Sequence, residues 1–403
     1  MAERKQLKIK CYGKGVSEVR GTLSCDTEYS LKHIEGDPTS VYRFYLTGDN
    51  FSLEITPSRG LSVRDFTCRG RQMFWNAPLE NLSDPDRIDM KKAMIINGES
   101  VKGTRWLEYF ASHIEMLGLD NWGVPVEKDG KVMGLHGNAS SVPVTEIILE
   151  ERDDRVVVSG SFYIHDPNEV LEKDNKSSRY FKVEKAIELY NERPVLVIKD
   201  KITNISGTPR FPDWGYHVQL KPEEGCRYLI PSKEVKERGK GIPEQGFEFW
   251  KKVSPSNEKG GSVREERGFI HKNLLLTDRA FPDGSRGIET LMYYSDGAGI
   301  KCVIPPSPYT MSWFSCGGKE STEFMIPGTD GSPDKKLLQK NWDGVGPEVG
   351  ASALDHDGDT DPAITQSVLD PGHSAEIQIY LELLEREPAE KLLKRIEDYN
   401  KNS

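Results

Sequence analysis

Residues Val144–His165, VTEIILEERDDRVVVSGSFYIH, form the clearest β pattern in the sequence. Two runs of alternating apolar and polar residues are joined by the Asp153-Asp154 dipeptide, which indicates a hairpin turn. Residues Ser178–Ser206, SRYFKVEKAIELYNERPVLVIKDKITNIS, repeat this form around an Asn-Glu turn. The alternation leaves one polar and one apolar face on each strand. It therefore predicts antiparallel sheets that stack into a sandwich.

The same pattern extends over most of the chain. FSLEITPSRG and LSVRDFTCRG, at residues 51–70, form a predicted hairpin around Pro57–Gly60, and the last strand pattern is AEIQIYLELL at residues 375–384. The sequence thus predicts an all-β protein with few short helices and a single domain over residues 1–403. Within it we expect N-terminal strands at 1–50, a polar surface insertion at about 233–268, and a C-terminal helix at about 388–401.

The composition limits the classes of function. The 403 residues carry a net charge of −10 with acids and bases interspersed, which argues against a nucleic-acid partner. No window approaches the roughly 20 apolar residues that span a bilayer. The charged N-terminus, MAERKQLKIKCYGKG, lacks the apolar segment of a secretory signal. Six scattered cysteines without a C-x-x-C pair predict neither a disulfide framework nor a thiolate metal site. We therefore expect a cytoplasmic protein with no membrane partner.

Residues Trp106–Val144 gather histidines, amides, acids and two tryptophans between glycines and prolines. A strand that served only a core would avoid this many polar atoms. In the Leu-His-Gly-Asn run, the glycine lets the His136 imidazole approach a ligand closely, and the Asn138 amide can hydrogen-bond a hydroxyl. Trp106 and Trp122 offer flat faces of the kind that cover the C–H side of a sugar ring. The segment predicts a binding site, although a core histidine satisfied by backbone groups would also account for His136.

Two further polar groups follow from the period of a strand. In DWGYHVQL, Asp213, His217 and Gln219 share one face because successive side chains alternate. His113 and Glu115 in SHIEM share a face for the same reason. Such pairs supply an acid and a base, or two ligands of a metal ion that needs at least a third. A polar sheet face without a function accounts for the same patterns, so both interpretations stay open from the residues alone.

The order of these residues resembles the galactose mutarotase-like (aldose 1-epimerase) superfamily, in its branch labelled only as a domain of unknown function. The resemblance covers roughly residues 50–385 and implies an antiparallel β-supersandwich with a sugar bound in a cleft on one concave sheet face. The matching residues, in chain order, are Arg59-Gly60, Trp75, Trp106 with Phe110, Gly118-Leu119, LHGN-x-S at 135–140, His217, Pro347-Glu348 and LDPG at 369–372.

The resemblance also implies roles for individual residues. His217 corresponds to the general acid of the mutarotases and Glu348 to the carboxylate base, while His136 is the other active-site histidine. Arg59 corresponds to the Arg-Gly motif of the branch and would bind a hydroxyl or an anionic group. The catalytic residues predicted are thus His217, Glu348 and His136; the substrate-binding residues are Arg59, Trp106, His113, Asn121, Trp122, Asn138, Asp213 and Gln219.

The chain departs from the branch in one loop. Residues 112–119 read SHIEMLGL where relatives usually have a Gly-Gly-Leu and a Thr-Thr-Cys-Gly-Leu stretch. The arginine that usually follows Leu-His-Gly is replaced by Asn138. These changes predict a rebuilt substrate-contacting loop.

The leading hypothesis is a cofactor-free aldose 1-epimerase with a small carbohydrate substrate. A base takes the proton of O1 and an acid protonates the ring oxygen, so that the ring opens and recloses on the other face. One carboxylate and one imidazole suffice, and the sequence carries neither a G-x-G-x-x-G after a strand nor a P-loop.

Two alternatives stay open. The first is a metal-dependent sugar isomerase, epimerase or lyase, with a divalent ion held by His113, Glu115 and His217. The second is a non-catalytic sugar-binding protein, since a fold does not determine a function. A homodimer is compatible with either.

Overall fold

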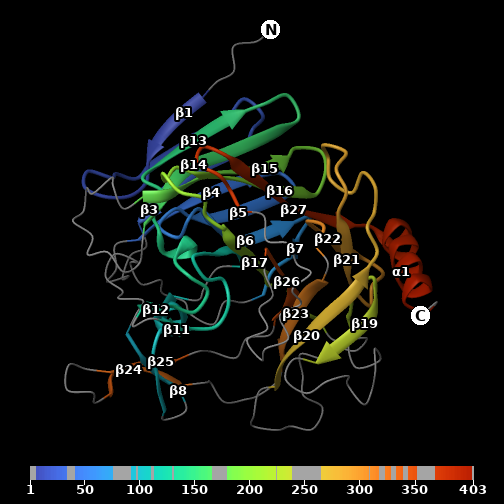
Figure 1. Ribbon diagram of the computed structural model, residues 1–403. Coiled ribbons are helices and arrows are strands. Elements are labelled where there is room, and N and C mark those ends of the chain that lie inside the picture. The colour runs from blue at the N-terminus through green and yellow to red at the C-terminus, as the bar shows by residue number, and fades with distance from the viewer. Residues whose placement is uncertain are drawn as a thin grey trace.

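The computed structural model describes residues 6–33, 41–75, 92–96, 99–109, 113–128, 131–165, 179–223, 225–237, 265–307, 309–316, 323–327, 333–338, 344–351 and 368–401. In these residues two large antiparallel sheets stack on each other (Figure 1). The nine-stranded sheet has, in order, β1 (Gln6–Lys10), β13 (Glu146–Glu151), β14 (Arg155–His165), β15 (Arg179–Tyr190), β16 (Val195–Asn204), β27 (Ser374–Leu384), β22 (Gly299–Ile304), β21 (Ile288–Tyr293) and β18 (Arg227–Leu229).

The second large sheet has twelve strands among the described residues. Their order is β19 (Ser232–Glu237), β20 (Glu265–Leu274), β23 (Tyr309–Cys316), β26 (Gly344–Gly350), β17 (Asp213–Val218), β10 (Ile114–Leu119), β6 (Ser62–Cys68), β5 (Phe51–Thr56), β4 (Tyr42–Gly48), β3 (Glu28–His33) and β2 (Val19–Thr22), with β7 (Arg71–Gln72) paired to β6. This sheet matters for function because β10, β17 and β26 come from distant parts of the chain yet lie side by side in it.

Short elements complete the description. One small sheet joins β11 (Val126–Lys128) to β12 (Lys131–Met133). Another has the order β25 (Pro333–Leu338), β24 (Glu323–Pro327), β8 (Met94–Ile96) and β9 (Glu99–Val101). Two 3-10 turns occupy Arg105–Tyr109 and Ala139–Ser141, and the helix α1 spans Arg386–Lys401. No helix in the described residues is long and apolar enough to cross a membrane.

The predicted all-β sandwich and its hairpins are confirmed. β13 and β14 pair across the Asp-Asp turn, β15 pairs with β16 across the Asn-Glu turn, and β5 pairs with β6 around Pro57–Gly60. Each hairpin folds locally because alternating residues on both arms point their apolar side chains the same way.

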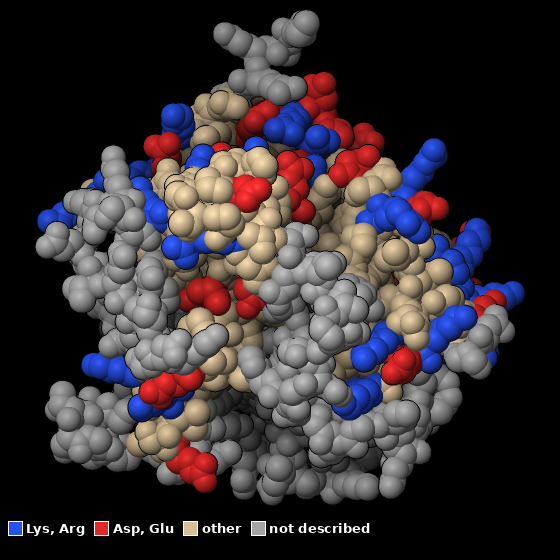
Figure 2. Space-filling model, viewed as in Figure 1, with Lys and Arg blue, Asp and Glu red and all other residues tan. Residues whose placement is uncertain are grey.

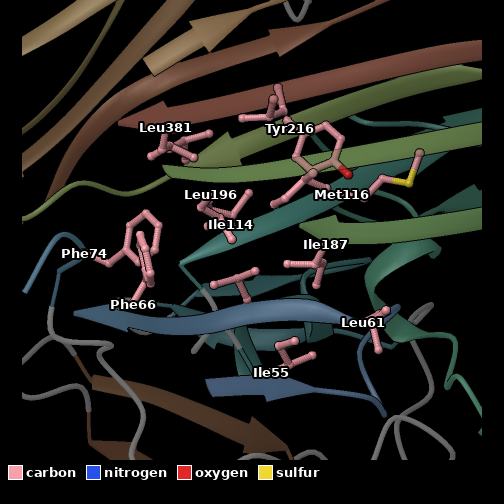
Figure 3. Packing of buried hydrophobic residues seen from close by; sticks show 14 of the residues in the cluster. Ile55, Leu61, Phe66, Phe74, Ile114, Met116, Ile187, Leu196, Tyr216 and Leu381 are labelled. Carbon is pink, nitrogen blue, oxygen red and sulfur yellow. The ribbon is translucent and has the colours of Figure 1, made fainter. Parts of the chain in front are cut away.

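The main core lies between the two large sheets. Figure 3 shows Leu196 and Leu381 of the nine-stranded sheet close to Ile114, Met116 and Tyr216 of the other sheet. These five side chains are at most 1% exposed. Each large aliphatic side chain buried in this way contributes about 1.5–3 kcal/mol to stability. The packing holds the central strands of both sheets rigidly in place.

The structure changes two predicted boundaries. Strand β19 continues to Glu237 and pairs with β20, and strand β20 begins at Glu265 and pairs with β23. Both ends of the predicted insertion at 233–268 are therefore paired strands. The charged residues of the edge strand β19 resemble those of a surface loop in the sequence, although Val235 of this strand is buried. Residues 238–264 lie outside the described part. The helix predicted at 388–401 begins at Arg386, because a proline is tolerated in a first helical turn.

Candidate active site

The candidate active site is built on one row of residues across three strands. Glu115 on β10 lies directly opposite His217 on β17, and His217 lies directly opposite Glu348 on β26. Residues directly opposite each other on antiparallel strands point to the same side. Their neighbours Met116 and Tyr216 point into the core (Figure 3), so the row lies on the other face of the sheet.

His217 and Glu348 form the centre of this row. The imidazole Nε2 lies 2.7 Å from Oε1 of Glu348, and the two side chains are 4% and 7% exposed. The Gln219 side-chain amide contacts Nδ1 of the same ring. An amide can either donate or accept a hydrogen bond after a rotation of its plane. Gln219 can therefore support both the neutral and the protonated imidazole while Glu348 faces Nε2.

Glu115 is bound from its other side by Arg59. The two side chains form an ion pair and neither has any exposed surface. Arg59 lies in the tight turn between β5 and β6, far from Glu115 in sequence. A buried carboxylate needs such a partner because an isolated buried charge is strongly unfavourable. The structure places Arg59 as the charge partner of Glu115, and the sugar contact that the resemblance implied stays a prediction.

His136 approaches the row from a separate turn. Its Nδ1–H donates to the Trp122 carbonyl at 2.8 Å, since a carbonyl oxygen can only accept. The ring then meets His217 edge to face, with 5.9 Å between centroids, and Trp106 at 4.5 Å. Trp106 is oriented by a hydrogen bond from Nε1 to Ser140. The structure thus places His136 against His217, which in turn contacts Glu348.

Trp106 and Trp122 form walls rather than an open platform. They are 1% and 2% exposed. The Trp122 ring lies on Gly215 of β17 and Gly350 of β26, where any Cβ would collide with the indole. These two glycines let the ring lie flat on the sheet beside the row. The contact of these indoles with a sugar stays a prediction.

His113 occupies the end of the same face next to β10. Its ring stacks on Phe74 with 5.7 Å between centroids and meets Trp75 edge to face. Trp75 in turn contacts Trp313, which contacts His217. His113 is therefore connected to His217 by packing through two indoles. Burial, and then the nearby positive charge of Arg64, lower the pKa of His113 well below 6.5.

This burial of His113 predicts a pH-dependent stability. In the folded state the ring stays neutral well below pH 6.5, whereas in the unfolded chain it binds a proton there. The free energy of unfolding therefore falls as the pH falls below 6.5. His113→Phe keeps the stacking and removes the proton site. The difference in unfolding free energy between the variant and the wild type should shift in favour of the variant by up to about 2 kcal/mol when the pH is lowered from 7.5 to 5.

The comparison is made by urea denaturation at the two pH values. Ile114→Ala is the matched control: it should cost about 2–5 kcal/mol of packing at both pH values. A His113→Phe variant with the same pH dependence as the wild type would show that His113 titrates normally.

The three remaining predicted residues hold the loops around the site. Asn121 donates to the carbonyls of Val124 and Gly134 at 2.9 and 3.0 Å. Asn138 donates through its amide to the His165 carbonyl at 3.3 Å. Asp213 accepts the Trp122 backbone N–H at 3.4 Å. These contacts make the three side chains structural supports of the turn that carries His136.

Sequence reasoning missed one residue at this site, Asp120. Its Oδ1 accepts the backbone N–H of Asn138 at 3.3 Å. Burial, and to a smaller extent the charge of Asp213, raise the pKa of Asp120 to about 7. Its position in the Leu-Asp-Asn-Trp run beside two predicted site residues was the available signal.

The three candidate metal ligands have other contacts in this structure. Glu115 pairs with Arg59, His217 contacts Glu348, and His113 packs against Phe74 and Trp75. In the part of the chain that the structure describes, no three His, Cys, Asp or Glu side chains are grouped as a metal ion requires. These positions thus serve packing and charge pairing in this structure.

The sequence matches one family over residues 42–272, described as "Domain of unknown function (DUF4432)". The chain belongs to this family. The match includes Arg59, His136 and His217 but ends before Glu348. No curated protein matches the sequence.

Solved structures show the same fold at low identity. A protein of Klebsiella pneumoniae, described as a proposed aldose 1-epimerase, has 17% identity and a TM-score of 0.64, with 99% of this chain and 96% of that chain covered. A galactose mutarotase-like protein of Clostridium acetobutylicum has 12% identity and a TM-score of 0.53, with 88% and 98% covered. The DUF4432 chain thus has the galactose mutarotase-like β-sandwich fold that the sequence resemblance implied.

Proposed function

We propose that this DUF4432 protein is an aldose 1-epimerase that interconverts the anomers of a carbohydrate. The observation that supports this most directly is the hydrogen-bonded pair of His217 and Glu348, held in cross-strand register on the sheet face opposite the core. An imidazole and a carboxylate at one position supply the acid and the base that ring opening requires.

The proposed reaction uses the two groups at one carbon of the sugar. O1 and the ring oxygen are both bonded to C1, so an acid and a base that touch each other can reach both oxygens. Glu348 takes the O1 proton as protonated His217 gives its proton to the ring oxygen, and the C1–ring oxygen bond breaks. After rotation about C1–C2 the same transfers run in reverse and close the ring on the other face.

The surrounding residues complete the proposal. Gln219 holds Nδ1 of His217 in both protonation states, and the His136 ring offers a hydrogen bond to a sugar hydroxyl. Low exposure strengthens these interactions because little water screens them. Acidic and basic side chains are interspersed on the face shown in Figure 2, which fits a small neutral partner better than a nucleic acid.

The proposal is tested by exchange spectroscopy on a panel of aldoses. The purified protein should exchange the α and β anomer signals of at least one sugar faster than the buffer alone. His217→Gln, which keeps polarity but cannot supply the proton, should return that rate to the buffer value. If no aldose shows catalysed exchange although sugars bind with measurable affinity, a non-catalytic sugar-binding protein is the better description.

We also expect the activity to require no metal ion. The reason is that Glu115 forms an ion pair with Arg59, so this carboxylate is already neutralised and is a poor ligand for a divalent ion. Activity should be unchanged after dialysis against EDTA, with an EDTA-treated sample to which Mn²⁺ or Zn²⁺ is restored as the control. A stoichiometric metal in elemental analysis, together with loss of activity on chelation, would support a metal-dependent isomerase or lyase.

A further inference from the structure

The turn that carries His136 has an unusual backbone. His136 has φ of +58° and Gly137 has φ of +62°, so two consecutive residues lie in the left-handed region. A residue with a Cβ is disfavoured there by about 1–2 kcal/mol. Such a conformation persists only where the surroundings hold it in place. The contacts that hold this turn therefore determine where the imidazole points.

The turn is attached to the end of β10 and to the loop at Gly123 by backbone hydrogen bonds. The His136 carbonyl accepts the Gly118 N–H at 2.8 Å, and the His136 N–H donates to the Gly123 carbonyl at 2.8 Å. Gly118 and Gly137 also form a bridge between the end of β10 and the turn. These bonds fix the first half of the turn, up to Gly137.

The second half is held by a carboxylate. Asp120 Oδ1 accepts the Asn138 N–H, and a Cβ on Gly137 would lie 2.5 Å from the same oxygen. The carboxylate therefore packs directly against the left-handed segment and accepts the N–H of the residue that follows it. Only glycine at position 137 lets it come this close.

A second carboxylate supports the imidazole through Trp122. Asp213 on β17 accepts the backbone N–H of Trp122, and the Trp122 carbonyl accepts the Nδ1–H of His136. Asp120 and Asp213 thus reach the same turn from adjacent strands, since Leu119 pairs with Asp213 across β10 and β17. One acid holds the backbone of the turn and the other holds the group that orients its ring.

We infer that Asp120 is a positioning residue for His136: its carboxylate, acting beside Asp213, holds the left-handed turn that presents the imidazole to His217 and Glu348. The inference rests on the proposed function only in giving His136 a role at the sugar. The position of the turn itself can be measured without substrate.

The environment of Asp120 makes this support depend on pH. Asp213 from β17 is the charged group that acts on it, while the backbone N–H groups of residues 120, 121 and 138 stabilise its anion. Burial is the largest influence and raises its pKa to about 7. Between pH 3.8 and 7 the folded protein therefore binds the extra proton, and this group lowers stability as the pH rises. The charge-assisted bond to Asn138 is complete only above pH 7.

The first test is amide hydrogen exchange at Asn138, followed by NMR at pH 8. Asp120→Ala removes the acceptor and should speed this exchange by about tenfold, the loss expected for a hydrogen bond to a charged group. Asp120→Asn keeps a neutral acceptor oxygen and should exchange at a rate between those of the wild type and Asp120→Ala. The exposed Asp278→Ala, 82% exposed in the side chain, is the control. Unchanged exchange at Asn138 in Asp120→Ala would overturn the inference.

A second measurement covers the case in which Asp120→Ala does not fold. In the wild type, the protection of the Asn138 amide, corrected for its intrinsic pH dependence, should fall by several-fold between pH 8 and pH 6. In Asp120→Asn it should be constant, and this variant should melt at a higher temperature than the wild type at pH 8 but not at pH 4.5. A wild-type protection that does not change with pH would also overturn the inference.

Anomerisation kinetics then separate positioning from catalysis. If the proposed function holds, Asp120→Ala should raise KM for the active sugar through the displaced His136, and Asp120→Asn should restore it. If no sugar is a substrate, the exchange results stand alone. Failure of the proposed function is thus distinguishable from failure of this inference.

Discussion

Glu348→Gln is expected to lower the catalysed anomerisation rate by about 10²–10⁴-fold, the contribution of a well-placed general base. The amide has the size and polarity of the carboxylate, so the hydrogen bond from Nε2 of His217 is preserved and the fold should be intact. It cannot accept the O1 proton, however. Sugar affinity should therefore change little while kcat falls.

The measurement is anomer exchange by NMR with the sugar identified in the panel, together with titration calorimetry for binding. Glu184→Gln is the matched control, because Glu184 lies on the other large sheet with its side chain 47% exposed. Wild-type activity in Glu348→Gln would remove Glu348 from the mechanism. A parallel loss of binding would instead show that the carboxylate serves recognition.

Arg59→Met is expected to lower the free energy of unfolding by about 3–5 kcal/mol. The substitution retains a long apolar side chain but leaves the Glu115 carboxylate buried next to His217 without its guanidinium. Breaking a fully buried ion pair from one side is costly because the remaining charge is neither solvated nor paired. This is the largest stability effect that we expect from a single change at the site.

The double variant Arg59→Met, Glu115→Met tests the origin of that loss. Removing both charges should recover most of the stability, since two apolar side chains of similar volume can replace a buried pair at little cost. Urea denaturation of the wild type, both single variants and the double variant completes the cycle. A single variant that costs less than about 1 kcal/mol, as an exposed pair would, contradicts the assigned burial.

Much of the site could be predicted because it follows strand alternation and short motifs. His217 on β17 and Gln219, just after the end of this strand, are two residues apart and their side chains meet, as a period of two predicts. The Leu-His-Gly-Asn run indicated His136 as a site residue. In the structure, Gly137 allows the close approach of the Asp120 carboxylate. Glu348 came from the resemblance, since the glycines and proline around it suggest a positioned carboxylate but do not suffice to distinguish it from a solvated glutamate.

The burial of several predicted residues could not be predicted, because burial is not visible in a local pattern. Arg59, Trp106 and Trp122 were expected to touch a sugar, yet the structure encloses all three. A polar or aromatic residue among glycines suggests an exposed site from sequence. The same glycines here let indoles pack flat on strands, as Gly215 and Gly350 do beneath Trp122.

The sequence by itself determined the strands, their hairpins and which residues of each strand share a face, because hydrogen bonding within a hairpin and side-chain alternation are local. Only the tertiary structure decided that β10, β17 and β26 are neighbours. That register places His217 between Glu115 and Glu348. The different partners of the two glutamates also depend on the tertiary structure. Glu115 pairs with Arg59, which lies in a turn distant in sequence, whereas Glu348 contacts the His217 imidazole. Buried charges depend on such partners, and chain spacing does not reveal them.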